Sequence, residues 1–119
     1  MSWLPGPCEL ASPAHARYRE LYEGLWTTGI EATVLDVCEQ RVHALVRCES
    51  DPTRTMVLTP LQRVCVAFAE QYVLDPHGLR DQDFEAMHEH LDDAGIAALV
   101  LAVSMFDARA RFEVALEVT

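Results

Sequence analysis

Basic residues are scarce in this chain of 119 residues. Lys and Arg together number 9 against 19 Asp and Glu, which gives a formal net charge of −10 at pH 7 with neutral histidines. A chain of that charge repels phosphate backbones and anionic lipid headgroups, so nucleic acid and membrane surfaces are not expected partners. The same charge keeps a small protein in solution.

Long apolar runs and targeting signals are also missing. The N-terminal tail, residues 1–11, has neither a basic n-region nor an apolar h-region, so it does not predict a secretory signal. The longest apolar run, residues 94–106, is shorter than the roughly 18–20 residues that cross a bilayer, and it therefore predicts a buried helix. We expect a cytoplasmic protein.

Paired cysteines are absent as well. The four cysteines show no CxxC spacing, and they are Cys8, Cys38, Cys48 and Cys65. In a chain without a secretory signal this pattern favours reduced thiols over a disulfide framework. Cys38 and Cys65 share apolar stripes with valine and phenylalanine, so we expect both in the core. The sequence also lacks a glycine-rich phosphate loop, a nucleophile elbow and a metal-binding motif, and no cofactor or metal is expected.

Alternating strand patterns are missing, whereas helical spacing of apolar residues is present throughout. Proline, glycine and capping residues divide the chain into expected helices over residues 13–29, 32–48, 60–74, 82–91 and 94–118. The clearest start is Thr59-Pro60-Leu61-Gln62, which has the form of a capping box with proline in the first turn. Residues 12–119 therefore predict a single all-α domain, a bundle of about five to six helices.

Two blocks of sequence resemble the alkylhydroperoxidase D-like and carboxymuconolactone decarboxylase family. The first runs from Leu21-Tyr22-Glu23-Gly24-Leu25-Trp26 to Val42, and the second from Leu58-Thr59-Pro60-Leu61-Gln62-Arg63 into the long last helix. The resemblance implies a helical bundle of that family, which assembles as a homo-oligomer and acts on small molecules. The blocks themselves are scaffold, so they bear on fold more than on chemistry.

Peroxidases of that family carry a glutamate, then a CxxC pair and a histidine. Aligned through Leu25-Trp26 and Arg41, this chain has Asp36 at the glutamate and Cys48 at the first cysteine, but Asp51 and Thr55 at the other two positions. A thiolate that attacks peroxide needs a resolving thiol and a proton relay, and both are replaced here. The resemblance therefore implies a member without the dithiol peroxidase motif. A second register instead places His43 at the family histidine.

The second helix carries the candidate site residues Asp36, Glu39 and His43 on one face, because steps of three and four residues align on a helix. One interpretation is an acid/base centre in which His43 moves the proton and a carboxylate orients it. Another is a solvated polar face with a Glu39–His43 pair, in which Thr33-x-x-Asp36 caps the helix. A metal is the third, although three ligands on one helix seldom close a site.

Three functions stay open from the sequence. The first is a cofactor-free acid/base reaction on a small molecule, carried by Asp36, Glu39 and His43. The second is a non-catalytic oligomeric scaffold or ligand-binding protein. The third is a one-cysteine peroxidase that uses Cys48 at the end of the second helix and an external thiol as reductant.

Overall fold

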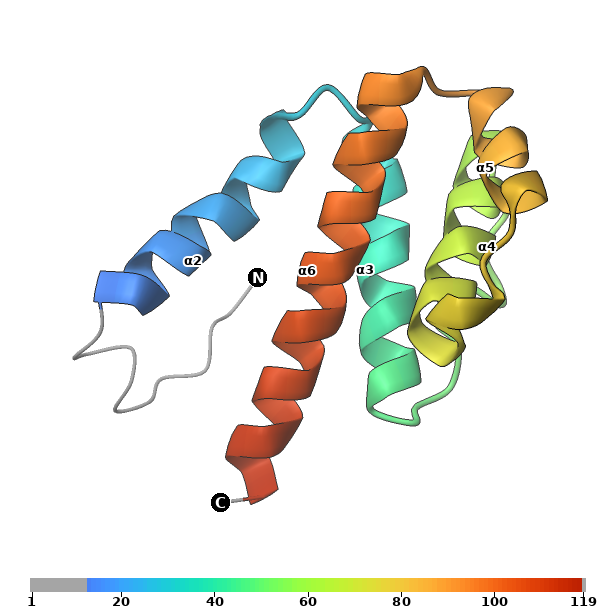
Figure 1. The fold of residues 1–119 in the computed structure, drawn as a ribbon. Coiled ribbons are helices and arrows are strands. Elements are labelled where there is room, and N and C mark those ends of the chain that lie inside the picture. Colours follow the sequence, from blue (N-terminus) through green and yellow to red (C-terminus); the bar gives the residue numbers. More distant parts are fainter. Residues whose placement is uncertain (1–12, 119) are drawn as a thin grey trace.

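The computed structural model describes residues 13–118, and these form five α-helices and two short 3₁₀ helices without any strand (Figure 1). The elements are α2 (Pro13–Gly24), η1 (Leu25–Thr27), α3 (Ala32–Val46), α4 (Pro60–Leu74), η2 (Pro76–Gly78), α5 (Asp81–His88) and α6 (Asp93–Val118). The expected all-α fold of about five to six helices is confirmed, with five α-helices among residues 13–118. The expected N-terminal tail, with Cys8, lies outside the described residues.

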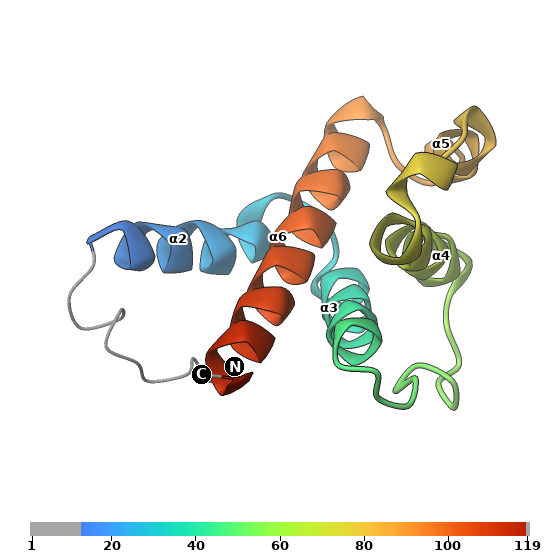
Figure 2. The same ribbon diagram turned by 60° about the horizontal axis from the view of Figure 1, so that its bottom comes forward.

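Helix α3 occupies the centre of the arrangement. It packs against α4 on one side and α6 on the other, and the short α5 contacts both α4 and α6. Helix α2 stands apart from this group: Figures 1 and 2 show it diverging from the α4 and α5 side of the molecule, with α6 between. Tyr18 of α2 donates to the Met105 carbonyl of α6, and Tyr22 of α2 donates to Glu39, so Glu39 lies where α2, α3 and α6 meet.

The capping box predicted at Thr59 is present. Its hydroxyl accepts a hydrogen bond from the Gln62 backbone N–H at 3.1 Å, and the Gln62 side chain accepts one from the Thr59 N–H at 2.9 Å. Two N–H groups that have no partner inside the helix are thereby satisfied, which fixes where α4 begins. The helix ends before Pro76, as the Asp75-Pro76 step predicts.

The first helix ends earlier than its expected limit at Gly29. Helix α2 stops at Gly24 and a 3₁₀ turn follows, in which the Thr27 and Thr28 hydroxyls donate to the carbonyls of Gly24 and Leu25 at 2.6 and 2.7 Å. Hydroxyls that bond to nearby carbonyls compete with the helical ladder. Gly29 then adopts a φ of +93°, a conformation that glycine takes without steric cost.

Buried apolar side chains from all five α-helices form one core. Its largest fully buried members include Tyr22, Leu35, Met87, Leu99 and Phe106. Cys38 and Cys65 are both completely buried and unpaired, as their apolar stripes predict. Among the described residues no helix is both long enough and apolar enough to cross a membrane.

Candidate functional site

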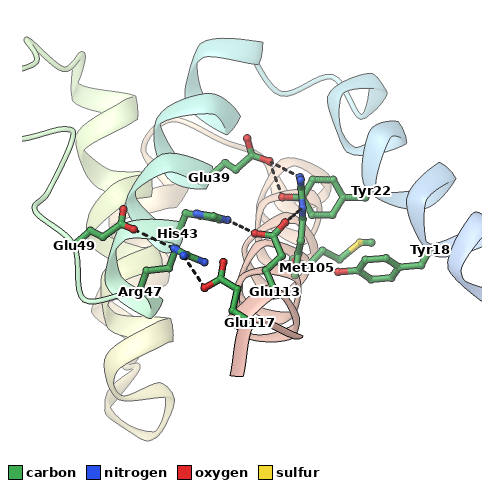
Figure 3. Close-up of polar contacts among 10 residues, drawn as sticks. Tyr18, Tyr22, Glu39, His43, Arg47, Glu49, Met105, Glu113 and Glu117 are labelled. Carbon is green, nitrogen blue, oxygen red and sulfur yellow. Dashed lines mark hydrogen bonds and ion pairs between the residues drawn. The ribbon is translucent and has the colours of Figure 1, made fainter. Parts of the chain in front are cut away.

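Glu39 is a carboxylate that the fold draws inward from α3. It accepts a hydrogen bond of 2.6 Å from the Tyr22 hydroxyl of α2, and its side chain is only 20% exposed (Figure 3). Burial raises the pKa of Glu39 above its ordinary value, while the Tyr22 hydroxyl and the Arg109 guanidinium act in the opposite direction. Glu39 is thus a partly buried carboxyl group that is hydrogen-bonded to a phenol.

The Tyr22 ring packs against an aromatic ring and a cation of α6. Its ring lies 5.7 Å from the Phe106 ring and 4.9 Å from the Arg109 guanidinium carbon. Burial, together with the hydrogen bond and negative charge of Glu39, raises the pKa of the Tyr22 phenol. The phenol therefore remains protonated and donates to Glu39.

His43 contacts a carboxylate of α6, whereas the sequence predicted a partner on α3. Its Nε2 lies 2.8 Å from Glu113 Oε2 on α6, and the two side chains are 36% and 12% exposed (Figure 3). Glu113 in turn accepts from Arg109 Nε at 2.9 Å. Arg109, only 5% exposed, also places Nη1 3.9 Å from Glu39 Oε2. The buried guanidinium thus lies between the Glu39 carboxylate of α3 and the Glu113 carboxylate of α6.

Asp36, Glu39 and His43 share one face of α3, as their spacing predicts, but each bonds to a different residue. Glu39 bonds to Tyr22 and His43 to Glu113, so the expected direct Glu39–His43 pair is not the one that forms. Asp36 lies apart and accepts a hydrogen bond from the Trp26 indole at 2.9 Å. It does not cap α3, because Glu31 precedes that helix and makes no side-chain cap.

Cys48, the remaining candidate, is exposed and unpaired just beyond the end of α3. It has a φ of +56°, and its N–H and that of Glu49 return to the carbonyls of Leu45 and Ala44 at 3.2 and 2.8 Å. This is the Schellman arrangement, in which glycine usually occupies the left-handed position. Neighbouring Arg47 already pairs with Glu49 and Glu117.

Asp51, which the resemblance aligns with a cysteine, holds the loop after α3 in place. Asp51 accepts hydrogen bonds from the Thr53 N–H at 2.8 Å and the Thr53 hydroxyl at 2.6 Å. It also lies 3.6 Å from Arg41, which binds Glu70 of α4 at 2.9 Å. Asp51 therefore ties the loop after α3 to the bundle. Within residues 13–118 no three His, Cys, Asp or Glu side chains are arranged to hold a metal ion.

Arg109 and Glu113 are the residues that sequence reasoning missed. Both follow Phe106 on the last helix, at steps of three and seven residues, where the apolar stripe continues. Charged residues at positions that a stripe assigns to the interior signal a buried polar contact, because an unpaired charge there is costly. That signal identifies the pair, but it does not reveal that α3 supplies the partners.

No protein-family model matches this chain, and no curated protein matches its sequence. The resemblance to alkylhydroperoxidase D-like and carboxymuconolactone decarboxylase proteins therefore stays a prediction from the two sequence blocks.

Proposed function

We propose that this chain is a divergent member of the alkylhydroperoxidase D-like and carboxymuconolactone decarboxylase family that carries out a cofactor-free acid/base reaction on a small molecule. The observation that carries the proposal is the contact of His43 with Glu113. An imidazole that is partly exposed, with one nitrogen held by a more deeply buried carboxylate, is the usual arrangement of a general acid or base.

The carboxylate is itself held in place. Arg109 binds Glu113 Oε1 while His43 binds Oε2, so the carboxylate is fixed from both sides. Orientation through Nε2 leaves Nδ1 of His43 for the proton of a substrate, since Nδ1 has no hydrogen bond with the described residues. A positioned imidazole of this kind contributes about 10²–10⁴-fold to a proton transfer.

Glu39, which is hydrogen-bonded to Tyr22, provides a second acid/base group near His43. Glu39 lies four residues before His43, one helical turn away on the same face of α3. Burial raises the pKa of Glu39, so its carboxyl stays protonated to a higher pH than that of an exposed glutamate, although the Tyr22 hydroxyl acts against this shift. A carboxyl and an imidazole one helical turn apart suit a reaction in which one group removes a proton and the other returns it.

The direct test is exchange of carbon-bound protons for deuterium in D₂O, followed by NMR on a panel of small lactones and 2-oxo acids. We expect the wild-type protein to accelerate exchange of at least one compound and His43→Gln to lose that acceleration. His88→Gln is the matched control, because His88 pairs with Asp93 at 3.3 Å on the exposed surface. Equal rates for wild type and His43→Gln across the panel would contradict the proposal.

A non-catalytic scaffold or ligand-binding protein is the second candidate. The observation that favours it is the position of Arg109 between Glu39 and Glu113, because this cation compensates both carboxylates without any ligand. On this interpretation the network stabilises the junction of α3 and α6. His43→Gln would then lower the free energy of unfolding and alter neither binding nor exchange of any compound in the panel.

A one-cysteine peroxidase is the third candidate, and it depends on Cys48. Its exposure is the favouring observation, since a thiol must be accessible to react with peroxide. Titration of the reduced protein with hydrogen peroxide, read by intact mass and peptide mapping, tests this function. Selective formation of a sulfenate at Cys48 and turnover with an external thiol would support it, whereas slow oxidation of every cysteine would rule it out.

A further inference from the structure

Two guanidinium groups lie near His43, and each is already engaged by two carboxylates. Arg109, which is 5% exposed, lies 2.9 Å from Glu113 and 3.9 Å from Glu39. Arg47 follows His43 by one turn of helix and is held in the same way. Its two partners lie at 3.0 and 2.9 Å and are Glu49 and Glu117 (Figure 3). A carboxylate on a substrate would therefore have to displace one of these partners to reach a cation.

The chain has few other cations to offer. It contains no lysine, and its 9 basic residues other than histidine are all arginines. Arg41, the arginine inside α3, binds Glu70 of α4 at 2.9 Å and lies 3.6 Å from Asp51. The net charge of −10 also gives the whole chain a field that attracts cations and repels anions as they approach. The local charges and the overall charge thus both act against an anionic substrate.

Carboxylates are in excess around His43. The ion pairs there join four carboxylates to two guanidiniums, so two negative charges remain when His43 is neutral, and one remains if Glu39 is also protonated. Asp36 adds another, because it is exposed and, among the described residues, only its Oδ1 has a hydrogen bond, from the Trp26 indole at 2.9 Å. Burial, and to a lesser extent the charge of Asp36, raises the pKa of Glu39, so these two carboxyl groups lie within electrostatic range of each other. An ammonium group at this face of α3 would be attracted by both.

We infer that the substrate of the acid/base reaction is a small amine, with a positively charged ammonium group that Asp36 binds and an acidic carbon that faces His43. The inference rests on the proposed function and adds the charge of the substrate to it. Asp36 and His43 are seven residues apart, which is about 10 Å along α3 and leaves room for a few bonds between the nitrogen and the acidic carbon. Asp36 is then the residue that selects the charge of the substrate, and it takes no part in the proton transfer.

Three methyl ketones that differ in charge test this inference: (4-oxopentyl)trimethylammonium, its neutral isostere 6,6-dimethylheptan-2-one, and the anion 5-oxohexanoate. Amide NMR titrations of the full chain at low salt measure their binding. We expect the cation to bind at least about threefold more tightly than the neutral ketone, with shifts at residues 36–43, and the anion to bind most weakly. Asp36→Asn keeps an acceptor for Trp26 and should remove most of this preference. Glu85→Gln, the matched control, removes an exposed charge on α5 and should preserve it.

The binding and exchange measurements separate the charge of the substrate from the chemistry. Absence of binding by the cation, equal affinity for all three ketones, or equal effects of Asp36→Asn and Glu85→Gln would overturn the inference. Higher salt should weaken binding of the cation, since screening reduces its attraction to the carboxylates. Deuterium exchange of the same ketones then tests the reaction: a cation that binds at α3 without faster exchange contradicts the acid/base proposal alone. Exchange of 5-oxohexanoate that is as fast as that of the cation contradicts the inference about charge alone.

Discussion

Removal of the Tyr22 hydroxyl tests the polar contacts at the junction of α2 and α3. Tyr22→Phe keeps the ring that packs on Phe106 and Arg109, and it removes the hydroxyl that donates to Glu39 at 2.6 Å and also interacts with Arg109. A hydrogen bond to a charged group contributes about 1.5–3 kcal/mol. Because Glu39 is 20% exposed and lies 3.9 Å from Arg109, we expect a loss near the lower end, about 1.5–2 kcal/mol.

The loss should depend on pH in a definite direction. The bond from Tyr22 favours the ionised form of Glu39, so its removal costs more at neutral pH than at a pH where Glu39 is protonated. Burial still holds the pKa of Glu39 above 4.5. The contribution of Glu39 to stability is therefore full below pH 4.5 and is lost as the pH rises through the folded-state pKa. In Glu39→Gln this decrease in stability with rising pH should disappear.

Urea unfolding followed by circular dichroism, at neutral pH and at pH about 4 (below the ordinary glutamate pKa), measures these differences. Tyr18→Phe is the control, because the Tyr18 hydroxyl donates to a neutral acceptor, the Met105 carbonyl, at 3.2 Å. We expect about 0.5–1.5 kcal/mol for that bond, with no increase toward neutral pH. A Tyr22→Phe effect no larger than that of Tyr18→Phe, or one that grows as the pH falls, would refute the reasoning.

Three further predictions concern helix ends and thiols. Thr59→Ala removes the capping box of α4 and should cost about 1 kcal/mol in thermal unfolding, and an unchanged melting temperature would contradict it. Cys48→Gly relieves the left-handed backbone and should stabilise the protein by about 0.5–1 kcal/mol, whereas destabilisation would argue that the Cys48 side chain itself matters. Native-state alkylation read by peptide mapping should modify Cys48 first. Cys38 and Cys65 should react only on unfolding, since both are buried and burial raises the pKa of Cys65 to about 12.

Local chemistry made most of the helix limits predictable. Thr59, Pro60 and Gln62 specify the start of α4 because the partners of that capping box lie within one turn of sequence. The end of α2 was predicted five residues too late, since the hydroxyls of Thr27 and Thr28 that bond backward carry no distinctive sequence pattern. The burial of Cys38 and Cys65 followed from the helical period alone.

The candidate site was predictable only in part. Helical spacing determined that Asp36, Glu39 and His43 share a face of α3, because that depends on one helix. It did not determine their partners: Trp26, Tyr22 and Glu113 lie 10, 17 and 70 residues away in sequence.

The sequence by itself determined the helical class, the start of α4 and the polar face of α3, since each depends on contacts within a few residues. Only the tertiary structure decided that Arg109 lies between two carboxylates and that His43 is oriented from α6. Those contacts depend on how three helices pack together, and packing is set by the whole core.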